Sequence, residues 1–234
     1  MVNAGQTATL AALRDHLGEL QQAQIAHGRR AIILLEGPPG SGKKAALRQL
    51  AAAFDPCYLA VHQCSFDRRE ASRGHWLAGF WAQLPSAGNT AVFFRSWYRR
   101  VLDDRVLGRV DETSIPRTFD EINEFEAQQR DYGTLIVKLY FSAADTVQRQ
   151  RIDACWTRQW PQLRREEPVS VSDSAYARAF AELQANSDTR WSPWKLIDAN
   201  DEGQGSIAAL EAIADAWSKA MPANPPQLIQ TIRA

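Results

Sequence analysis

Short apolar runs alternate along the chain with longer segments in which apolar residues recur every three or four positions. The runs predict buried strands over residues 31–35, 57–62, 90–94, 134–142 and 193–197. The periodic segments predict helices over residues 7–27, 43–50, 75–84, 101–107, 119–132, 174–186 and 207–221. Strands that alternate with helices in this way are typical of α/β proteins. We therefore expect a five-stranded, mainly parallel sheet with helices on both faces.

A glycine-rich segment, GPPGSGK at residues 37–43, connects the first predicted strand to a helix. It matches the phosphate-binding loop G-x-x-x-x-G-K, in which backbone N–H groups and a helix N-terminus surround an anion and the lysine adds charge. The predicted phosphate-binding residues are Gly37, Gly40, Ser41, Gly42, Lys43 and Lys44. Lys44 stands where Ser or Thr usually ligates magnesium. A strand-to-helix turn that binds nothing is the alternative.

The composition limits the kinds of partner that we expect for this protein. The 27 basic and 27 acidic side chains cancel, so no overall field attracts nucleic acid or a membrane. Three cysteines without C-x-x-C spacing suit reduced thiols better than disulfides or zinc. No apolar stretch approaches the roughly 20 residues that span a bilayer, and the N-terminus lacks the pattern of a secretory signal. We expect a soluble, cytoplasmic protein with no nucleic-acid or membrane partner.

Basic side chains gather at two places that suit phosphate chemistry. Arg95, Arg99 and Arg100 follow the third predicted strand, where they could converge with Lys43 on phosphate. Residues 143–165 are rich in Arg and Trp, and this segment, which includes Arg151, could close over a bound phosphate as a lid. For both groups, a solvated basic surface is the alternative.

Two other polar side chains lie in or beside predicted strands. Lys138 stands within the strand 134–142, where a buried lysine needs an anion or carboxylate partner unless it reaches an edge. His62 is expected at the C-terminal end of the second strand, where open α/β sheets bind ligands. A hydrogen-bonded structural role is the alternative for His62.

Several short motifs follow one another from about residue 30 to the C-terminus: residues 35–37 (LEG), 42–43 (GK), 95–98 (RSWY), 100–102 (RVL), 104–106 (DRV), 121–123 (EIN), 125–126 (FE), Gly133, 137–138 (VK), Gln148 with Arg151, and 193–194 (PW). Together, and in this order, they resemble the polyphosphate kinase 2 family of P-loop phosphotransferases. The RSWY sequence at a strand end after a P-loop is far more specific than the P-loop alone.

The resemblance implies a three-layer α/β/α P-loop kinase-like fold. Residues 1–234 would form one domain, with an N-terminal helix over residues 1–28 and a helical lid over residues 143–190. The activity implied is transfer of a phosphoryl group between inorganic polyphosphate and a nucleoside mono- or diphosphate, with magnesium as the metal and a homo-oligomer as the assembly.

The resemblance also implies roles for four cationic side chains. Lys43 would hold phosphates, Arg95 and Arg100 would stabilise charge on the transferring group, and Arg151 would act from the lid. Positioning and charge neutralisation are most of what phosphoryl transfer asks of a protein.

The chain departs from the family's pattern at the residues that would bind the metal. Pro39 and Phe94 replace two family aspartates that serve the metal and the acceptor phosphate. This leaves the metal ligands unknown, with Asp104, Asp201 or phosphate oxygens alone as candidates. One alternative is therefore a catalytically impaired relative that binds polyphosphate or nucleotide as a regulatory or partner subunit. Another is an enzyme that uses ATP as the donor for a different small acceptor.

Overall fold

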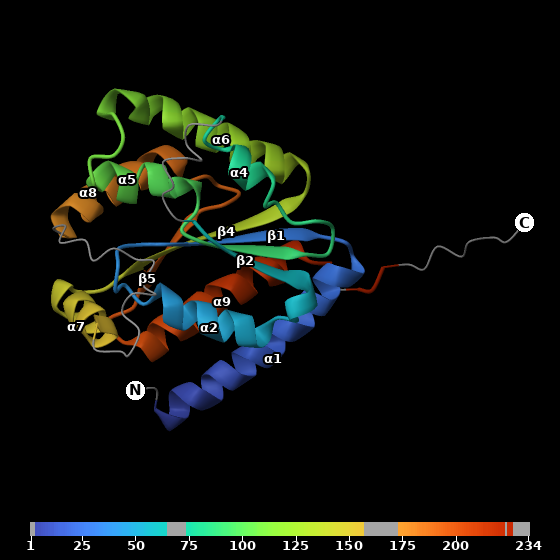
Figure 1. The fold of residues 1–234 in the computed structure, drawn as a ribbon. Coiled ribbons are helices and arrows are strands. Elements are labelled where there is room, and N and C mark those ends of the chain that lie inside the picture. Colours follow the sequence, from blue (N-terminus) through green and yellow to red (C-terminus); the bar gives the residue numbers. More distant parts are fainter. Residues whose placement is uncertain (1–2, 65–73, 157–172, 223, 227–234) are drawn as a thin grey trace, which may run out of the picture.

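The computed structural model describes residues 3–64, 74–156, 173–222 and 224–226. At its centre lies a sheet whose strand order is β2-β3-β1-β4-β5, with every neighbouring pair parallel (Figure 1). The strands are β1 (Arg30–Glu36), β2 (Leu59–Gln63), β3 (Thr90–Phe94), β4 (Thr134–Ser142) and β5 (Trp194–Asp198). The expected five-stranded α/β architecture is therefore confirmed.

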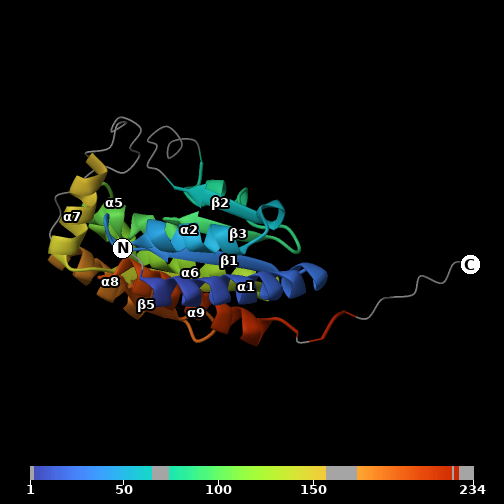
Figure 2. The same cartoon turned by 90° about the horizontal axis from the view of Figure 1, so that it is seen from below.

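Helices cover both faces of this sheet. One face carries α1 (Ala4–Ala26), α2 (Lys43–Ala53) and α9 (Glu202–Ala220), and the other carries α4 (Ala78–Trp81), α5 (Asp103–Val106), α6 (Ile115–Asp131) and α8 (Asp173–Ser187) (Figures 1 and 2). Helix α7 (Asp145–Trp156) stands at the edge where the strands end, next to the beginning of α2 (Figure 1). The protein therefore has three layers, with the sheet between two layers of helices, and α7 lies over the carboxyl edge of the sheet.

Alternation along each strand divides the interior into two apolar cores. In β1, Ile33 and Leu35 pack with the residues of α1, α2 and α9, whereas Ile32 and Leu34 pack with those of α6 and α8. Both sets of side chains are almost completely buried. A strand covered on both faces reads as a continuous apolar run, which is why β1 and β4 were readable from the sequence.

Several predicted boundaries were wrong for local reasons. Helix α1 begins at Ala4 rather than near residue 7, because Asn3 and Gln6 form a reciprocal capping box. The helix expected over residues 75–84 is reduced to the single turn α4, in a segment that contains Gly79 and is followed by Pro85. The second strand begins at Leu59 because the preceding residues form the 3₁₀ helix η1 (Pro56–Tyr58).

The prediction of one helix over residues 101–107 is also wrong. The chain forms the 3₁₀ helix η2 (Trp97–Arg100), capped by the Ser96 side chain, and then the short α5. Leu102 separates them with φ −108° and ψ −95°, which is not a helical conformation. A further 3₁₀ helix, η3 (Glu112–Ser114), precedes α6. The chain therefore turns back on itself directly after the RSWY sequence.

Three remaining expectations concern single residues or segments. His62 lies within β2 rather than at its end, and its ring stacks on Phe93 with 5.1 Å between centroids. Of the expected lid, residues 157–172 lie outside the described part of the chain. None of the described helices is both long enough and apolar enough to cross a membrane.

Candidate functional site

The glycine-rich loop passes close to two neighbouring segments. Gly37, Gly40 and Gly42 all have positive φ angles, of 132°, 75° and 97°. A Cβ atom on Gly40 would lie 2.6 Å from the carbonyl oxygen of Gln148 in α7, and one on Gly37 would overlap the carbonyl oxygen of Phe141. Residues with side chains rarely adopt these conformations. The loop therefore owes its course between β4, α7 and α2 to glycine.

Lys43 directs its charge into this loop. The residue is buried, and its Nζ donates hydrogen bonds to the carbonyl oxygens of Gly37 and Pro38 and to Ser41 Oγ, the last two at 2.8 and 3.2 Å. Nζ also lies 5.7 Å from the centroid of the Phe94 ring, which is a cation–π contact. The loop thus surrounds a cation at the N-terminus of α2, the end of a helix that attracts anions. Lys44, by contrast, is exposed.

Arg95 follows β3 in a strained backbone conformation. Its φ of 62° is the only positive value at a non-glycine residue in the described part of the chain, and such strain persists only where the surroundings fix it. The backbone N–H of Arg95 donates to Leu35 O at 3.2 Å. The next residue, Ser96, donates from its N–H and its Oγ to Glu36 Oε1, at 2.6 and 2.7 Å. The end of β1 therefore fixes the turn that carries Arg95.

Carboxylates surround this turn. Glu36 is fully buried, and burial, together with the nearby Asp103 carboxylate, raises its pKa to about 7, although hydrogen bonds from Ser96 and the charge of Lys43 oppose the rise. Asp103 Oδ2 lies 3.4 Å from Arg95 Nε, and Asp103 Oδ1 accepts a 2.7 Å hydrogen bond from Tyr176 Oη. Burial raises the pKa of Tyr176 well above its ordinary value, and the Asp103 charge adds to the effect.

The two other arginines after RSWY face different partners. The Arg100 guanidinium lies 5.2 Å from the Trp76 ring centroid, and its Nε donates to Thr118 Oγ1 at 3.4 Å. Arg99 contacts Asp104 at 3.0 Å, and Arg109 lies 3.6 Å from the same carboxylate oxygen. Burial raises the pKa of Asp104, and these arginines oppose the rise. Arg100 is thus held towards α6 by aromatic and hydroxyl contacts.

Arg151 reaches the phosphate loop from α7. Its guanidinium donates to Gly40 O at 3.2 Å, to Ala199 O at 2.7 Å and to Asn200 O at 3.0 Å. Its Nε also lies 3.5 Å from Glu202 Oε1. The structure therefore brings Arg151 to the rim of the same loop that contains Lys43, and it joins that loop to the polar segment after β5.

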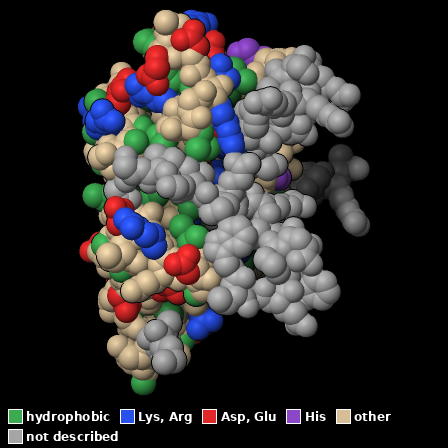
Figure 3. Space-filling view, turned by 60° about the vertical axis from the view of Figure 1, so that its left-hand side comes forward, with side chains coloured by type: hydrophobic (Ala, Val, Ile, Leu, Met, Phe, Trp, Pro, Cys, Tyr) green, Lys and Arg blue, Asp and Glu red, His purple; other side chains and the backbone are tan. Residues whose placement is uncertain are grey.

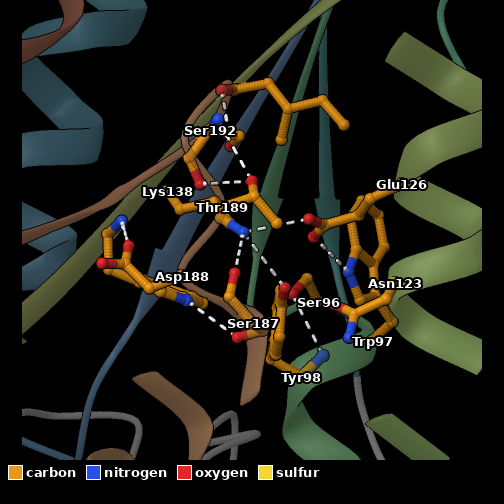
Figure 4. Close-up of polar contacts among 12 residues, drawn as sticks. Ser96, Trp97, Tyr98, Asn123, Glu126, Lys138, Ser187, Asp188, Thr189 and Ser192 are labelled. Atoms are coloured by element: carbon orange, nitrogen blue, oxygen red, sulfur yellow. Dashed lines mark hydrogen bonds and ion pairs between the residues drawn. The ribbon is translucent and has the colours of Figure 1, made fainter. Parts of the chain in front are cut away.

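Lys138, the buried lysine of β4, forms an ion pair with a carboxylate. Lys138 Nζ lies 3.0 Å from Glu126 Oε2 in α6, and both side chains are fully buried. Lys138 also donates to Ser187 O at 2.7 Å and to Tyr98 Oη at 3.3 Å, and Trp97 Nε1 donates to the other Glu126 oxygen at 3.0 Å (Figure 4). Of the two alternatives for Lys138, the structure has the carboxylate partner rather than the edge position, and the pair contacts Trp97 and Tyr98 of the RSWY segment.

The described residues do not fit a magnesium ion held by protein carboxylates. They contain no group of three or more His, Cys, Asp or Glu side chains suited to a metal. Asp104 is engaged by arginines, and Asp201 caps α9 and accepts a hydrogen bond from Gln6 at 2.9 Å. Glu36 Oε2 has no hydrogen-bond partner, but it is closed off from solvent. Both candidates from the sequence, Asp104 and Asp201, thus already have protein partners at Oδ1, and they stand apart from any group of three potential ligands in the described residues.

Three residues of this region were not predicted: Glu36, Asp103 and Tyr176. Glu36 carried a signal, because it is a charged residue that ends an otherwise apolar strand. The other two, Asp103 and Tyr176, carried no such signal.

Figure 3 turns the carboxyl edge of the sheet forward, and the basic and acidic side chains of the described residues are interspersed over this face.

Comparison with known proteins gives consistent matches. The family model described as polyphosphate kinase 2 matches residues 2–225. A polyphosphate:AMP phosphotransferase of Pseudomonas syringae pv. tomato is 31% identical over 196 residues, which are 81% of this chain and 39% of that protein. A GDP-polyphosphate phosphotransferase of Mycobacterium tuberculosis is 28% identical over 82% of this chain and 66% of that protein. The chain spans 39% to 42% of the length of the polyphosphate:AMP phosphotransferases that it matches.

Solved structures agree in fold. The crystal structure of polyphosphate kinase 2 from Arthrobacter aurescens TC1 superposes with a TM-score of 0.84 at 26% identity, over 96% of this chain and 82% of that one. The crystal structure of a putative polyphosphate kinase 2 from Pseudomonas aeruginosa gives a TM-score of 0.81 at 25% identity, over 92% of this chain and 47% of that one. The expected three-layer P-loop kinase-like architecture is that of these neighbours.

Proposed function

The chain belongs to the polyphosphate kinase 2 family, and we propose that it transfers a phosphoryl group between inorganic polyphosphate and a nucleoside mono- or diphosphate. The observation that carries this proposal is the phosphate loop, with the buried cation of Lys43 inside it and the Arg151 guanidinium on its rim. Its relatives support the substrate class, because they are named polyphosphate:AMP, ADP-polyphosphate, GDP-polyphosphate and NDP-polyphosphate phosphotransferases.

The cations of the site suit this chemistry. In phosphoryl transfer, the protein mainly aligns the donor and acceptor and neutralises the charge on the transferring oxygens. Phosphate oxygens would take the place of the carbonyl oxygens that now accept from Lys43 Nζ, because a charge-assisted bond to an anion is stronger than one to a neutral carbonyl. Arg151 would bind the same phosphate chain from α7, and Arg95 and Arg100 would meet the charge that develops during transfer.

Magnesium, the metal implied by the family, would neutralise phosphate charge when it is bound. We propose that substrate phosphate oxygens hold it, since Pro39 and Phe94 supply no ligand and the Asp104 carboxylate is engaged by arginines. The protein's own contribution is then cationic, through Lys43 and the three arginines.

The experiment is a transfer assay from polyphosphate to AMP, ADP, GMP and GDP, with magnesium or manganese present. Lys43→Ala provides the background, and Lys195→Ala provides a matched control because Lys195 is exposed on β5. We expect the Lys43 variant to lose about 100-fold or more in rate, the usual effect of removing one preorganised contact to developing charge. The control should retain the rate of the unmodified protein.

Two results would count against the proposal. No transfer to any of the four acceptors would contradict the activity itself. Equal transfer by the unmodified and Lys43→Ala proteins would place the reaction elsewhere than in this loop. Calorimetric titration with polyphosphate separates loss of binding from loss of turnover in the Lys43 variant.

A further inference from the structure

A short chain of buried polar groups runs from the end of β3 to α8. Arg95 Nε lies 3.4 Å from Asp103 Oδ2, and Tyr176 Oη donates to Asp103 Oδ1 at 2.7 Å. Asp103 is 3% exposed and Tyr176 is 4% exposed. A carboxylate at such a depth is costly unless cations and donors compensate it. Asp103 therefore has a defined orientation, set by one group on each side.

The backbone brings Asp103 to this place. Leu102, with its non-helical φ and ψ, ends the turn that follows η2, and Asp103 then opens α5. Without that break, a continuous helix from residue 97 onward would carry residue 103 along its axis and away from the strand end. The interruption of the helix after RSWY thus returns a carboxylate to the arginine that opens RSWY.

Arg95 is consequently fixed at both ends. Its backbone is held at φ 62° by the contacts to β1, through Leu35 O and through the Ser96 bonds to Glu36. Its guanidinium forms an ion pair with Asp103, in which Nε lies 3.4 Å from Oδ2. Groups that stabilise developing charge act best when they are oriented before the reaction.

We propose that Asp103 is a positioning residue for Arg95 and that Tyr176 sets the orientation of Asp103 from α8. This inference rests on the proposed function, since it assigns Arg95 to the transferring phosphoryl group. Because Asp103 acts through Arg95, its loss should lower kcat and leave the KM values for polyphosphate and nucleotide within about twofold.

A second contact between the same helices supplies the control. Arg105 in α5 contacts Glu182 in α8 at 2.7 Å. This pair docks α8 on α5 as the Tyr176 bond does, but neither member is in the chain of contacts to Arg95. Glu182→Gln therefore weakens the packing of α8 without touching the proposed positioning.

The first test compares Asp103→Asn, Tyr176→Phe and Glu182→Gln in the transfer assay. We expect kcat to fall about tenfold for Asp103→Asn and about threefold for Tyr176→Phe, and to stay unchanged for Glu182→Gln. In an Arg95→Ala background, Asp103→Asn should have no further effect, because the group it positions is gone. A further tenfold loss in that background, or an equal loss in Glu182→Gln, would overturn the proposal.

The second test does not depend on activity. In ¹⁵N-arginine NMR of the ligand-free protein, the Nε–Hε signal of Arg95, assigned with Arg95→Lys, should shift in both Asp103→Asn and Tyr176→Phe and stay in place in Glu182→Gln. An unmoved signal in the first two variants would refute the positioning. If the unmodified protein transfers no phosphoryl group, the proposed function fails, and this measurement still decides whether Asp103 holds Arg95. Tyr176→Phe, which removes one hydroxyl, keeps both tests open if Asp103→Asn does not fold.

Discussion

Replacing Lys138 with methionine would leave the Glu126 carboxylate buried without its cation. Methionine keeps most of the apolar stem, so the change removes chiefly the charge and three polar contacts: those to Glu126 Oε2 at 3.0 Å, Ser187 O at 2.7 Å and Tyr98 Oη at 3.3 Å (Figure 4). Both charged side chains have 0% exposure. Water therefore cannot replace the lost partner.

The magnitude follows from this burial. Removing one member of a buried ion pair costs about 3–5 kcal/mol of the free energy of unfolding, because the remaining charge is left uncompensated. For a chain of this size, each kcal/mol lowers the melting temperature by roughly 2–4 °C. We therefore expect Lys138→Met to melt about 10 °C below the unmodified protein.

The assay is equilibrium unfolding in urea at pH 7, followed by tryptophan fluorescence. Lys195→Met is the matched control, because it makes the same substitution at an exposed position on the neighbouring strand β5, where the expected change is within about 0.5 kcal/mol. Glu126→Gln and the double variant complete a cycle. We expect the double variant to be more stable than the sum of the single losses predicts, by about 1 kcal/mol or more.

A loss below about 1 kcal/mol in Lys138→Met would refute this reasoning. It would mean that Glu126 is protonated or solvated at no cost once the lysine is gone. Additive losses in the cycle would show that the two side chains stabilise the fold independently rather than as a pair.

Two further predictions concern the loop and its base. Since the pKa of Glu36 in the folded protein, about 7, lies above its ordinary 4.5, the stabilisation from its protonated form is complete below pH 4.5 and is lost as the pH rises through 7. Glu36→Gln should therefore gain about 3 kcal/mol in stability relative to the unmodified protein between pH 4.5 and pH 8, as measured by urea unfolding, and a difference independent of pH would contradict the assignment. Gly40→Ala should weaken polyphosphate binding at least about tenfold by calorimetry, because φ is 75° at this residue and Gln148 O would lie 2.6 Å from the new Cβ. Gly79→Ala is the control, because a Cβ there would meet nothing within 4 Å. Equal polyphosphate affinities of Gly40→Ala and the unmodified protein would show that the loop tolerates a side chain.

Local features of the chain were predictable because their causes are local. The runs that form β1 and β4 are apolar since both faces of the sheet are covered. The glycines of the phosphate loop indicate positive φ angles, and the structure has such angles at Gly37, Gly40 and Gly42. The start of α1 was also encoded locally, in the capping box of Asn3 and Gln6, although the expected boundary was later in the chain.

Partners were only partly predictable. The sequence shows that Lys138 needs an anion, yet it cannot name Glu126 or the Ser187 carbonyl, which other elements bring to it. Similarly, Arg151 was expected over a phosphate, but its contact with Gly40, 111 positions away along the chain, depends on how α7 stands at the edge of the sheet.

The sequence by itself therefore determined the α/β architecture, the phosphate loop and the family, since periodicity, glycine and motif spacing act over short stretches. Tertiary structure alone decided that Asp103 faces Arg95 and that Tyr176, 73 positions away, holds Asp103. A break at Leu102 and the docking of α8 produce that juxtaposition. Neither leaves a periodic pattern, because a hydrogen bond between distant residues depends on where the folded chain returns rather than on which residues are neighbours in sequence.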